Sequence, residues 1–139
     1  MVKMQISTKT GYAVRALSVL AKQPHEKPLS IAVLCKDQNL PKKYIEQLFR
    51  KLKQKDLIKS VHGSKGGYII NKTISEISLK DIMIAVEDNF PTSSCYGNSS
   101  ELEYCSGMPC AFYDFWDDIK KNIEKYLDSI TLDQIVSRI

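Results

Sequence analysis

The segment from Pro41 to Lys55 constrains the fold more than any other part of the chain. Large apolar residues recur three and four positions apart through it, which is the spacing of the buried face of an α-helix. They are Ile45, Leu48, Phe49 and Leu52. Pro41 suits the first turn of a helix because proline lacks the N–H that would go unpaired there. The pattern predicts a helix with an exposed face made of Lys42, Lys43, Glu46, Gln47, Arg50, Lys51 and Lys53.

Two shorter helices are expected before this segment, and a hairpin after it. The first helix should have Ser7 or Thr8 as its N-cap and run to about Ala21, and a second, short helix should follow Ser30 as its cap. Two short strands, 57–61 and 68–70, flank the glycine-rich turn 62–67. This order of elements is the layout of a winged helix-turn-helix. We therefore expect a mainly α fold with a small two-stranded wing.

A fourth helix and a long fifth helix are expected in the second half. Ser78 and Asp81 form a capping-box pattern for the fourth helix, and Thr131 with Gln134 forms another for a short final helix. The long helix should run from about Phe112 to Ile130. Its apolar stripe is Phe115, Trp116, Ile119, Ile123, Tyr126 and Leu127. This stripe could pack on its own domain, but we favour a second copy of the chain because two-fold homodimers are the commonest oligomers.

Three regions follow from this order. Residues 1–88 should form the winged helix-turn-helix domain, and residues 89–111 an irregular cysteine-bearing segment. Residues 112–139 should form the dimerisation helix and C-terminal tail.

The cations of the chain are concentrated in its first half. Residues 1–70 carry 14 Lys and Arg against 4 Asp and Glu, whereas residues 71–139 carry 6 against 12. The surplus is densest at residues 36–65, where a winged helix meets DNA. A solvated lysine-rich surface would have the same composition, but this position favours double-stranded DNA as the partner. The predicted DNA contacts are Lys42, Lys43, Glu46, Gln47, Arg50, Lys51, His62, Ser64 and Lys65.

Two of these residues are suited to reading bases. The carboxylate of Glu46 can accept a hydrogen bond from cytosine, and the amide of Gln47 can pair with adenine. The alternative for Glu46 is an ion pair with Lys43 or Arg50 on the same helix.

Three of the four cysteines lie close together in the sequence, at Cys95, Cys105 and Cys110. Clustered thiolates are soft ligands that suit an iron–sulfur cluster or zinc. An iron–sulfur cluster is the first hypothesis, a bare thiol switch the second and zinc the third. Cys35 stands apart on the second helix and is expected to be a buried core residue.

Other function classes find less support. No apolar run approaches the roughly 18 residues needed to span a membrane, and the first residues do not form a signal peptide. We therefore expect a soluble, cytoplasmic protein. His25 and His62 are the two histidines, and no nucleophile–base pattern or phosphate loop appears, so an enzyme is not expected. A small electron carrier would not need the basic helix or the wing.

Four runs of residues, together with the three cysteines before Trp116, form a specific combination; the runs lie at residues 7–14, 44–49, 63–68 and 127–132. In these motifs the chain resembles the IscR/NsrR-type, or Rrf-two, family of bacterial winged-helix regulators. The resemblance implies a homodimeric transcriptional regulator whose DNA affinity responds to an iron–sulfur cluster. The resemblance leaves the cluster type open, and we favour [2Fe–2S] over [4Fe–4S]. It assigns Cys95, Cys105 and Cys110 as cluster ligands.

The chain departs from the family at positions that supply the fourth ligand. Tyr113 stands where some relatives have a histidine, and residues 1–20 contain no acidic residue. Asp114, Glu101, Glu103 or an external thiol or water are the candidates that remain. A cluster-free regulator, acting through thiol oxidation or a protein partner of cysteine metabolism, is the alternative.

Overall fold

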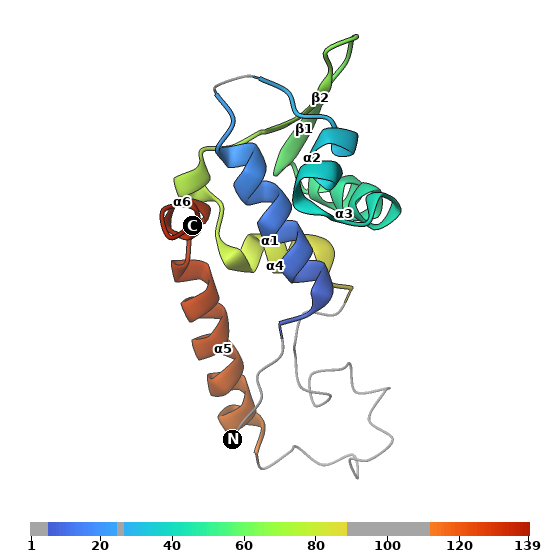
Figure 1. Cartoon of the computed structure of the whole chain (residues 1–139). Coiled ribbons are helices and arrows are strands. Elements are labelled where there is room, and N and C mark those ends of the chain that lie inside the picture. Colours follow the sequence, from blue (N-terminus) through green and yellow to red (C-terminus); the bar gives the residue numbers. More distant parts are fainter. Residues whose placement is uncertain (1–5, 25–26, 89–111) are drawn as a thin grey trace.

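The computed structural model describes residues 6–24, 27–88 and 112–139. It confirms the predicted winged helix, mostly helical with one two-stranded antiparallel sheet (Figure 1). The elements in chain order are α1 (Thr8–Ala21), α2 (Ile31–Gln38), α3 (Lys42–Gln54), β1 (Ile58–Val61), β2 (Gly67–Ile70), the 3₁₀ turn η1 (Ile74–Glu76), α4 (Leu79–Val86), α5 (Tyr113–Ser129) and α6 (Leu132–Val136).

Side-chain caps lie at the starts of α1, α2 and α4. The Ser30 hydroxyl accepts a hydrogen bond from the Val33 N–H at 3.3 Å. At α4 the Ser78 hydroxyl accepts from the Asp81 N–H, and the Asp81 carboxylate accepts from the Ser78 N–H, both at 3.0 Å. The start of α3 differs from expectation by one residue. Pro41 has an extended backbone and precedes the helix instead of forming its first turn.

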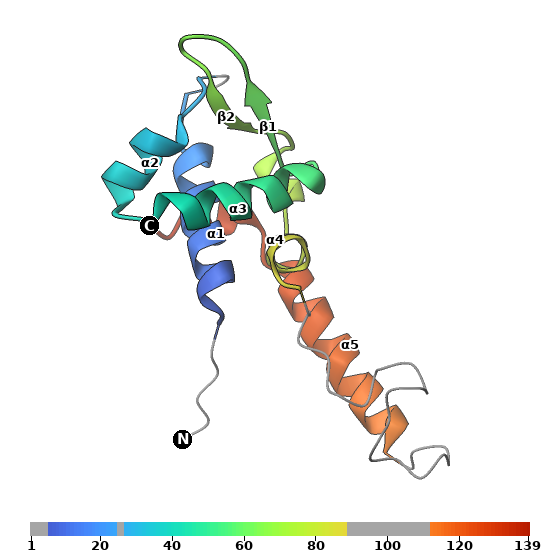
Figure 2. The same cartoon turned by 90° about the vertical axis from the view of Figure 1, so that its right-hand side faces the viewer.

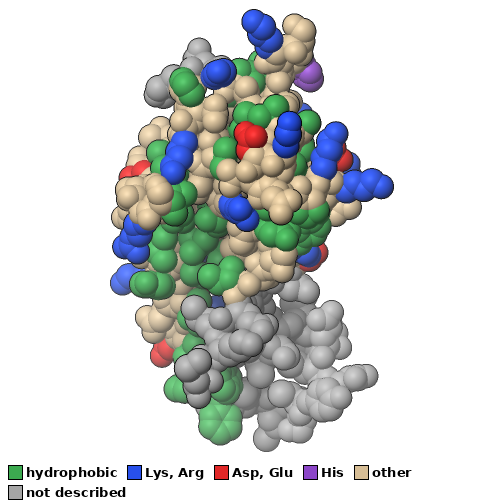
Figure 3. Space-filling view, viewed as in Figure 1, with side chains coloured by type: hydrophobic (Ala, Val, Ile, Leu, Met, Phe, Trp, Pro, Cys, Tyr) green, Lys and Arg blue, Asp and Glu red, His purple; other side chains and the backbone are tan. Residues whose placement is uncertain are grey.

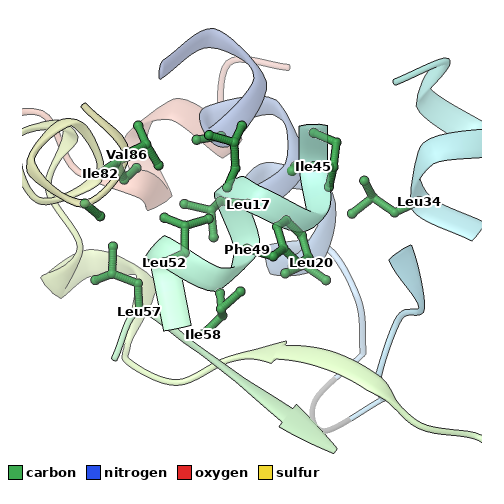
Figure 4. Packing of buried hydrophobic residues seen from close by; sticks show 14 of the residues in the cluster. Leu17, Leu20, Leu34, Ile45, Phe49, Leu52, Leu57, Ile58, Ile82 and Val86 are labelled. Carbon is green, nitrogen blue, oxygen red and sulfur yellow. The ribbon is translucent and has the colours of Figure 1, made fainter. Parts of the chain in front are cut away.

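The core is built around α3. All four apolar residues predicted for its inner face are buried, and Figure 4 shows three of them, Ile45, Phe49 and Leu52, among side chains from neighbouring elements. Leu17 comes from α1 and Ile82 from α4 (Figure 4). The exposed face of α3 is therefore held in place by a face that cannot rotate without losing buried apolar area.

Cys35 is also part of this core, as expected. Burial raises the pKa of its thiol, and the nearby carboxylate of Glu46 raises it further. A thiol held in its neutral form is a poor nucleophile and metal ligand.

The wing is anchored to the loop before α2. Strands β1 and β2 pair from Ile58–Ile70 to Val61–Gly67. The backbone of Tyr68 then exchanges two hydrogen bonds with Leu29, at 2.9 and 3.1 Å. This extra pairing ties the base of the wing to the start of the helix-turn-helix.

Helix α5 projects away from the rest of the described structure (Figure 2), and α6 returns to it (Figure 1). Backbone hydrogen bonds join Leu79 to Ile130 at 2.7 Å and Leu132 to Ile77 at 2.8 Å. The Leu132 side chain is fully buried in the core. Residues 130–136, which the sequence suggested grouping with the dimerisation helix, thus pack on the winged helix itself.

None of the helices in the described ranges combines the length and apolar character that a membrane crossing requires.

Candidate nucleic-acid interface

The outward face of α3 carries most of the side chains predicted to contact DNA. Lys42, Lys43, Glu46, Gln47 and Arg50 are all exposed. They occupy the helix opposite the buried apolar face, so the core fixes the direction in which they point. Within the described ranges Glu46 forms no ion pair with Lys43 or Arg50. The carboxylate of Glu46 therefore has no ion-pair partner on α3.

The wing places a second set of polar residues beyond the end of the strands (Figures 1 and 2). His62, Ser64 and Lys65 are exposed in its turn. Gly63 has a φ of 124°, a conformation that glycine adopts readily and other residues rarely adopt. The turn and the loop before α2 border an open depression of about 720 Å³, whose lining includes Lys27 and Lys65. Lys and Arg side chains are spread over this part of the surface in Figure 3.

Lys51 differs from the other predicted contacts because it is already engaged within the protein. It lies at the border between the exposed and buried faces of α3 and is half-buried. Its ammonium lies 2.5 Å from an Asp88 carboxylate oxygen and 3.4 Å from the Val86 carbonyl. The other Asp88 oxygen accepts a hydrogen bond from the Lys9 ammonium at 2.7 Å.

These contacts change the ionisation of the groups involved. Hydrogen bonds and the positive charges of Lys51 and Lys9 lower the pKa of Asp88 to about 2. The hydrogen bond to Asp88 raises the pKa of Lys9. Both effects favour the charged forms, so the three side chains form an ion cluster at neutral pH.

The preceding residue, Glu87, is held by the first turn of α1. Its carboxylate accepts hydrogen bonds from the Thr10 hydroxyl at 2.7 Å and from the Ser7 hydroxyl. The first turn of α1 has no acidic residue of its own, so α4 supplies the negative charge that favours a helix N-terminus. Sequence reasoning missed this arrangement because its members are 77 to 80 positions apart.

Helix α5 exposes most of the stripe predicted for dimerisation. The side chains of Phe115, Trp116, Ile119, Ile123 and Tyr126 are 38 to 68% exposed. Leu127 is half-buried. Phe112, not included in the prediction, is 65% exposed and extends the apolar surface. An ion pair of 3.7 Å between Lys80 and Glu124 joins α5 to α4.

The three cysteines predicted as cluster ligands lie outside the described residues, as do Glu101 and Glu103. Asp114 is exposed in the first turn of α5. Among the described side chains, no three His, Cys, Asp or Glu residues are grouped closely enough to hold a metal ion.

Comparison with known proteins agrees with this fold. The family model described as "Rrf2: Iron-dependent Transcriptional regulator" matches residues 6–138. The HTH-type transcriptional regulator IscR of Pectobacterium atrosepticum is 33% identical over 135 residues, which cover 96% of this chain and 80% of the relative.

Two solved structures share the fold. T. potens IscR has 32% identity and a TM-score of 0.72, covering 97% of this chain and 88% of that one. CymR, the global cysteine regulator of B. subtilis, has 30% identity and a TM-score of 0.74, covering 99% of both chains. These relatives are regulators and not enzymes, in agreement with the sequence-based expectation.

Proposed function

Since the chain belongs to the Rrf2 family of transcriptional regulators, we propose that it acts as a homodimer that reads DNA through α3 and the wing. The observation that carries this proposal is the exposed, cation-rich face of α3, held in place by a fully buried opposite face. A helix of this kind fits the major groove, which is roughly 12 Å wide.

The residues divide by their chemistry into two roles. Lys42, Lys43 and Arg50 bind phosphates, while Glu46 and Gln47 at the middle of the exposed face reach base edges. His62, Ser64 and Lys65 in the wing contact the neighbouring backbone. Phosphate contacts supply most of the affinity through counterion release, and the two central residues supply sequence preference.

Helix α5 provides the dimer contact in this proposal. Five large apolar side chains on one helix are unfavourable in water, and a second copy of the same stripe would cover them. The two α3 helices must then lie about one turn of DNA, ~34 Å, apart to enter successive major grooves.

An iron–sulfur cluster at Cys95, Cys105 and Cys110 is proposed as the regulatory group. Three soft thiolate donors suit iron–sulfur chemistry, and the matching family model describes iron-dependent regulators. We favour [2Fe–2S] over [4Fe–4S], with Asp114, Glu101, Glu103 or an external ligand completing the site. When bound, such a group supplies sensitivity to oxidants, nitric oxide and iron supply.

A cluster-free regulator is the second candidate. It is favoured by the similarity to a global cysteine regulator over nearly the full length of both chains. In that case the cysteines act as redox-sensitive thiols, or the DNA affinity responds to a protein partner.

Anaerobic purification followed by iron and sulfide analysis separates the two candidates. Visible charge-transfer bands with stoichiometric iron and sulfide support the cluster, whereas a colourless iron-free dimer that binds DNA supports the alternative. DNA binding should weaken steeply with salt, with a log–log slope of about −7 if roughly 8 phosphates are neutralised. A dimer that ignores duplex DNA at low salt would contradict both.

A further inference from the structure

Asp88 forms ion pairs that connect three helices of the DNA-binding domain. It follows α4, and its two carboxylate oxygens take Lys9 of α1 and Lys51 of α3 separately, at 2.7 and 2.5 Å. Lys51 donates as well to the carbonyl of Val86, at the end of α4. The ammonium of Lys51 is thus turned toward α4 by two acceptors.

The position of Lys51 on α3 determines whether its ammonium could reach DNA. Arg50, the residue before Lys51, is exposed, and Leu52, the residue after it, is buried. Lys51 therefore lies at the edge of the face proposed to enter the major groove. The edges of such a helix lie nearest to the two phosphate backbones that border the groove, so a free cation there would meet a phosphate.

A carboxylate and a phosphate oxygen bind an ammonium by the same charge-assisted hydrogen bonds. Accordingly, we propose that Asp88 is an internal competitor of the DNA backbone, which keeps Lys51 out of the set of phosphate-binding cations and so limits DNA affinity. This inference rests on the proposed function of α3. Under this proposal Lys51, which the sequence predicted as a DNA contact, binds Asp88 and not a DNA phosphate in the conformation described.

The contact is open to change because it lies at the surface. The Asp88 side chain is 66% exposed and the Lys51 side chain 34%, and an exposed ion pair exchanges readily with other partners. Glu87 is satisfied independently by Ser7 and Thr10, so loss of the Asp88 contacts leaves the junction of α4 with α1 intact. In the sequence, Asp88 immediately precedes residues 89–111, which carry the three cysteines.

The test measures the salt dependence of binding to a fluorescein-labelled duplex of mixed sequence, about 30 base pairs long, by anisotropy. Each additional phosphate contact steepens the log–log slope by about 0.9. Asp88→Asn should bind severalfold more tightly than the wild type, with a slope steeper by at least about 0.9. Adding Lys51→Met to Asp88→Asn should remove about 0.9 of that slope again.

Lys51→Met alone gives a reading that does not depend on the Asp88 substitution. Since Asp88 already binds the Lys51 ammonium, removing that ammonium should leave the salt slope at its wild-type value. A slope shallower by about 0.9 would place Lys51 on a phosphate in the wild-type complex and overturn the proposal.

Asp56→Asn is the matched control. It removes one negative charge just beyond α3 from a side chain that is exposed and forms no ion pair among the described residues. An equal steepening in Asp56→Asn and Asp88→Asn would show a general charge effect and reject the role of Asp88.

The result also separates this inference from the function on which it rests. A wild-type protein with no salt-dependent duplex binding rejects the proposed function and the competitor with it. A steep wild-type slope that Asp88→Asn leaves unchanged, or a weaker affinity at that slope, rejects only the competitor and leaves the proposed function standing.

Discussion

Gly67 in β2 lies directly against the backbone of Leu29, so that a Cβ atom at residue 67 would be 2.4 Å from the Leu29 carbonyl oxygen. The two hydrogen bonds between Leu29 and Tyr68 depend on this approach. Gly67→Ala should therefore push the wing away from α2 and destabilise the fold by about 1–3 kcal/mol. Urea denaturation followed by circular dichroism measures the difference.

Gly11→Ala is the control for that substitution. A Cβ at residue 11 has no neighbour within 4 Å, and alanine has the better helix propensity. This variant should be more stable than the wild type by up to about 1 kcal/mol. If both variants proved equally stable, the close approach of Gly67 to Leu29 would not restrict residue 67 to glycine.

Leu132→Ala tests whether α6 belongs to the folding unit of the winged helix. The side chain of Leu132 is fully buried, and its N–H donates to the Ile77 carbonyl. Truncation should cost about 2–5 kcal/mol of unfolding free energy, as for other buried leucines. Ile139→Ala, which truncates a side chain that is 70% exposed, should change the stability little. A small effect of Leu132→Ala would show that α6 docks weakly.

Lys43→Met and Gln47→Ala should separate phosphate binding from base reading. Lys43→Met should weaken binding to every duplex and make the salt slope shallower by about 0.9. Gln47→Ala should leave the slope unchanged and cost about 1–3 kcal/mol only on the preferred sequence. Anisotropy titrations on a selected sequence and on mixed-sequence DNA provide both readings. Identical effects of the two variants would contradict this division of roles.

Ile123→Glu tests the apolar stripe of α5. Ile123 is 45% exposed, and a carboxylate placed there would lose its hydration if a second copy covered the stripe. Sedimentation should show a monomer for this variant and a dimer for the wild type. Val33→Glu on α2, where the apolar side chain is 47% exposed, should remain dimeric. A dimer of unchanged strength in Ile123→Glu would place the contact elsewhere.

Much of the fold was predictable because its signals are local. The spacing of Ile45, Leu48, Phe49 and Leu52 predicted the buried face of α3, and the Ser78–Asp81 pattern predicted the cap of α4. Contacts over long sequence separation were not predictable in this way. No local pattern pairs Lys51 with Asp88, and side-chain periodicity alone placed Lys51 with its exposed neighbours. The return of α6 to the core likewise depends on backbone pairing of residues 77–79 with 130–132.

The depressed pKa of Asp88 predicts a specific pH dependence of stability. The carboxyl has a pKa of about 2 in the folded protein, against an ordinary value of 3.8. A lowered folded pKa means that the stabilising contribution is fully present above about pH 5, is lost as the pH falls through the folded pKa, and is gone by about pH 1. Asp88→Asn should therefore be less stable than the wild type at pH 6, and most of this difference should be lost at pH 2. Denaturant unfolding at both pH values provides the measurement, with Asp56→Asn as control. A difference as large at pH 2 as at pH 6 would show that the ion cluster with Lys9 and Lys51 does not account for it.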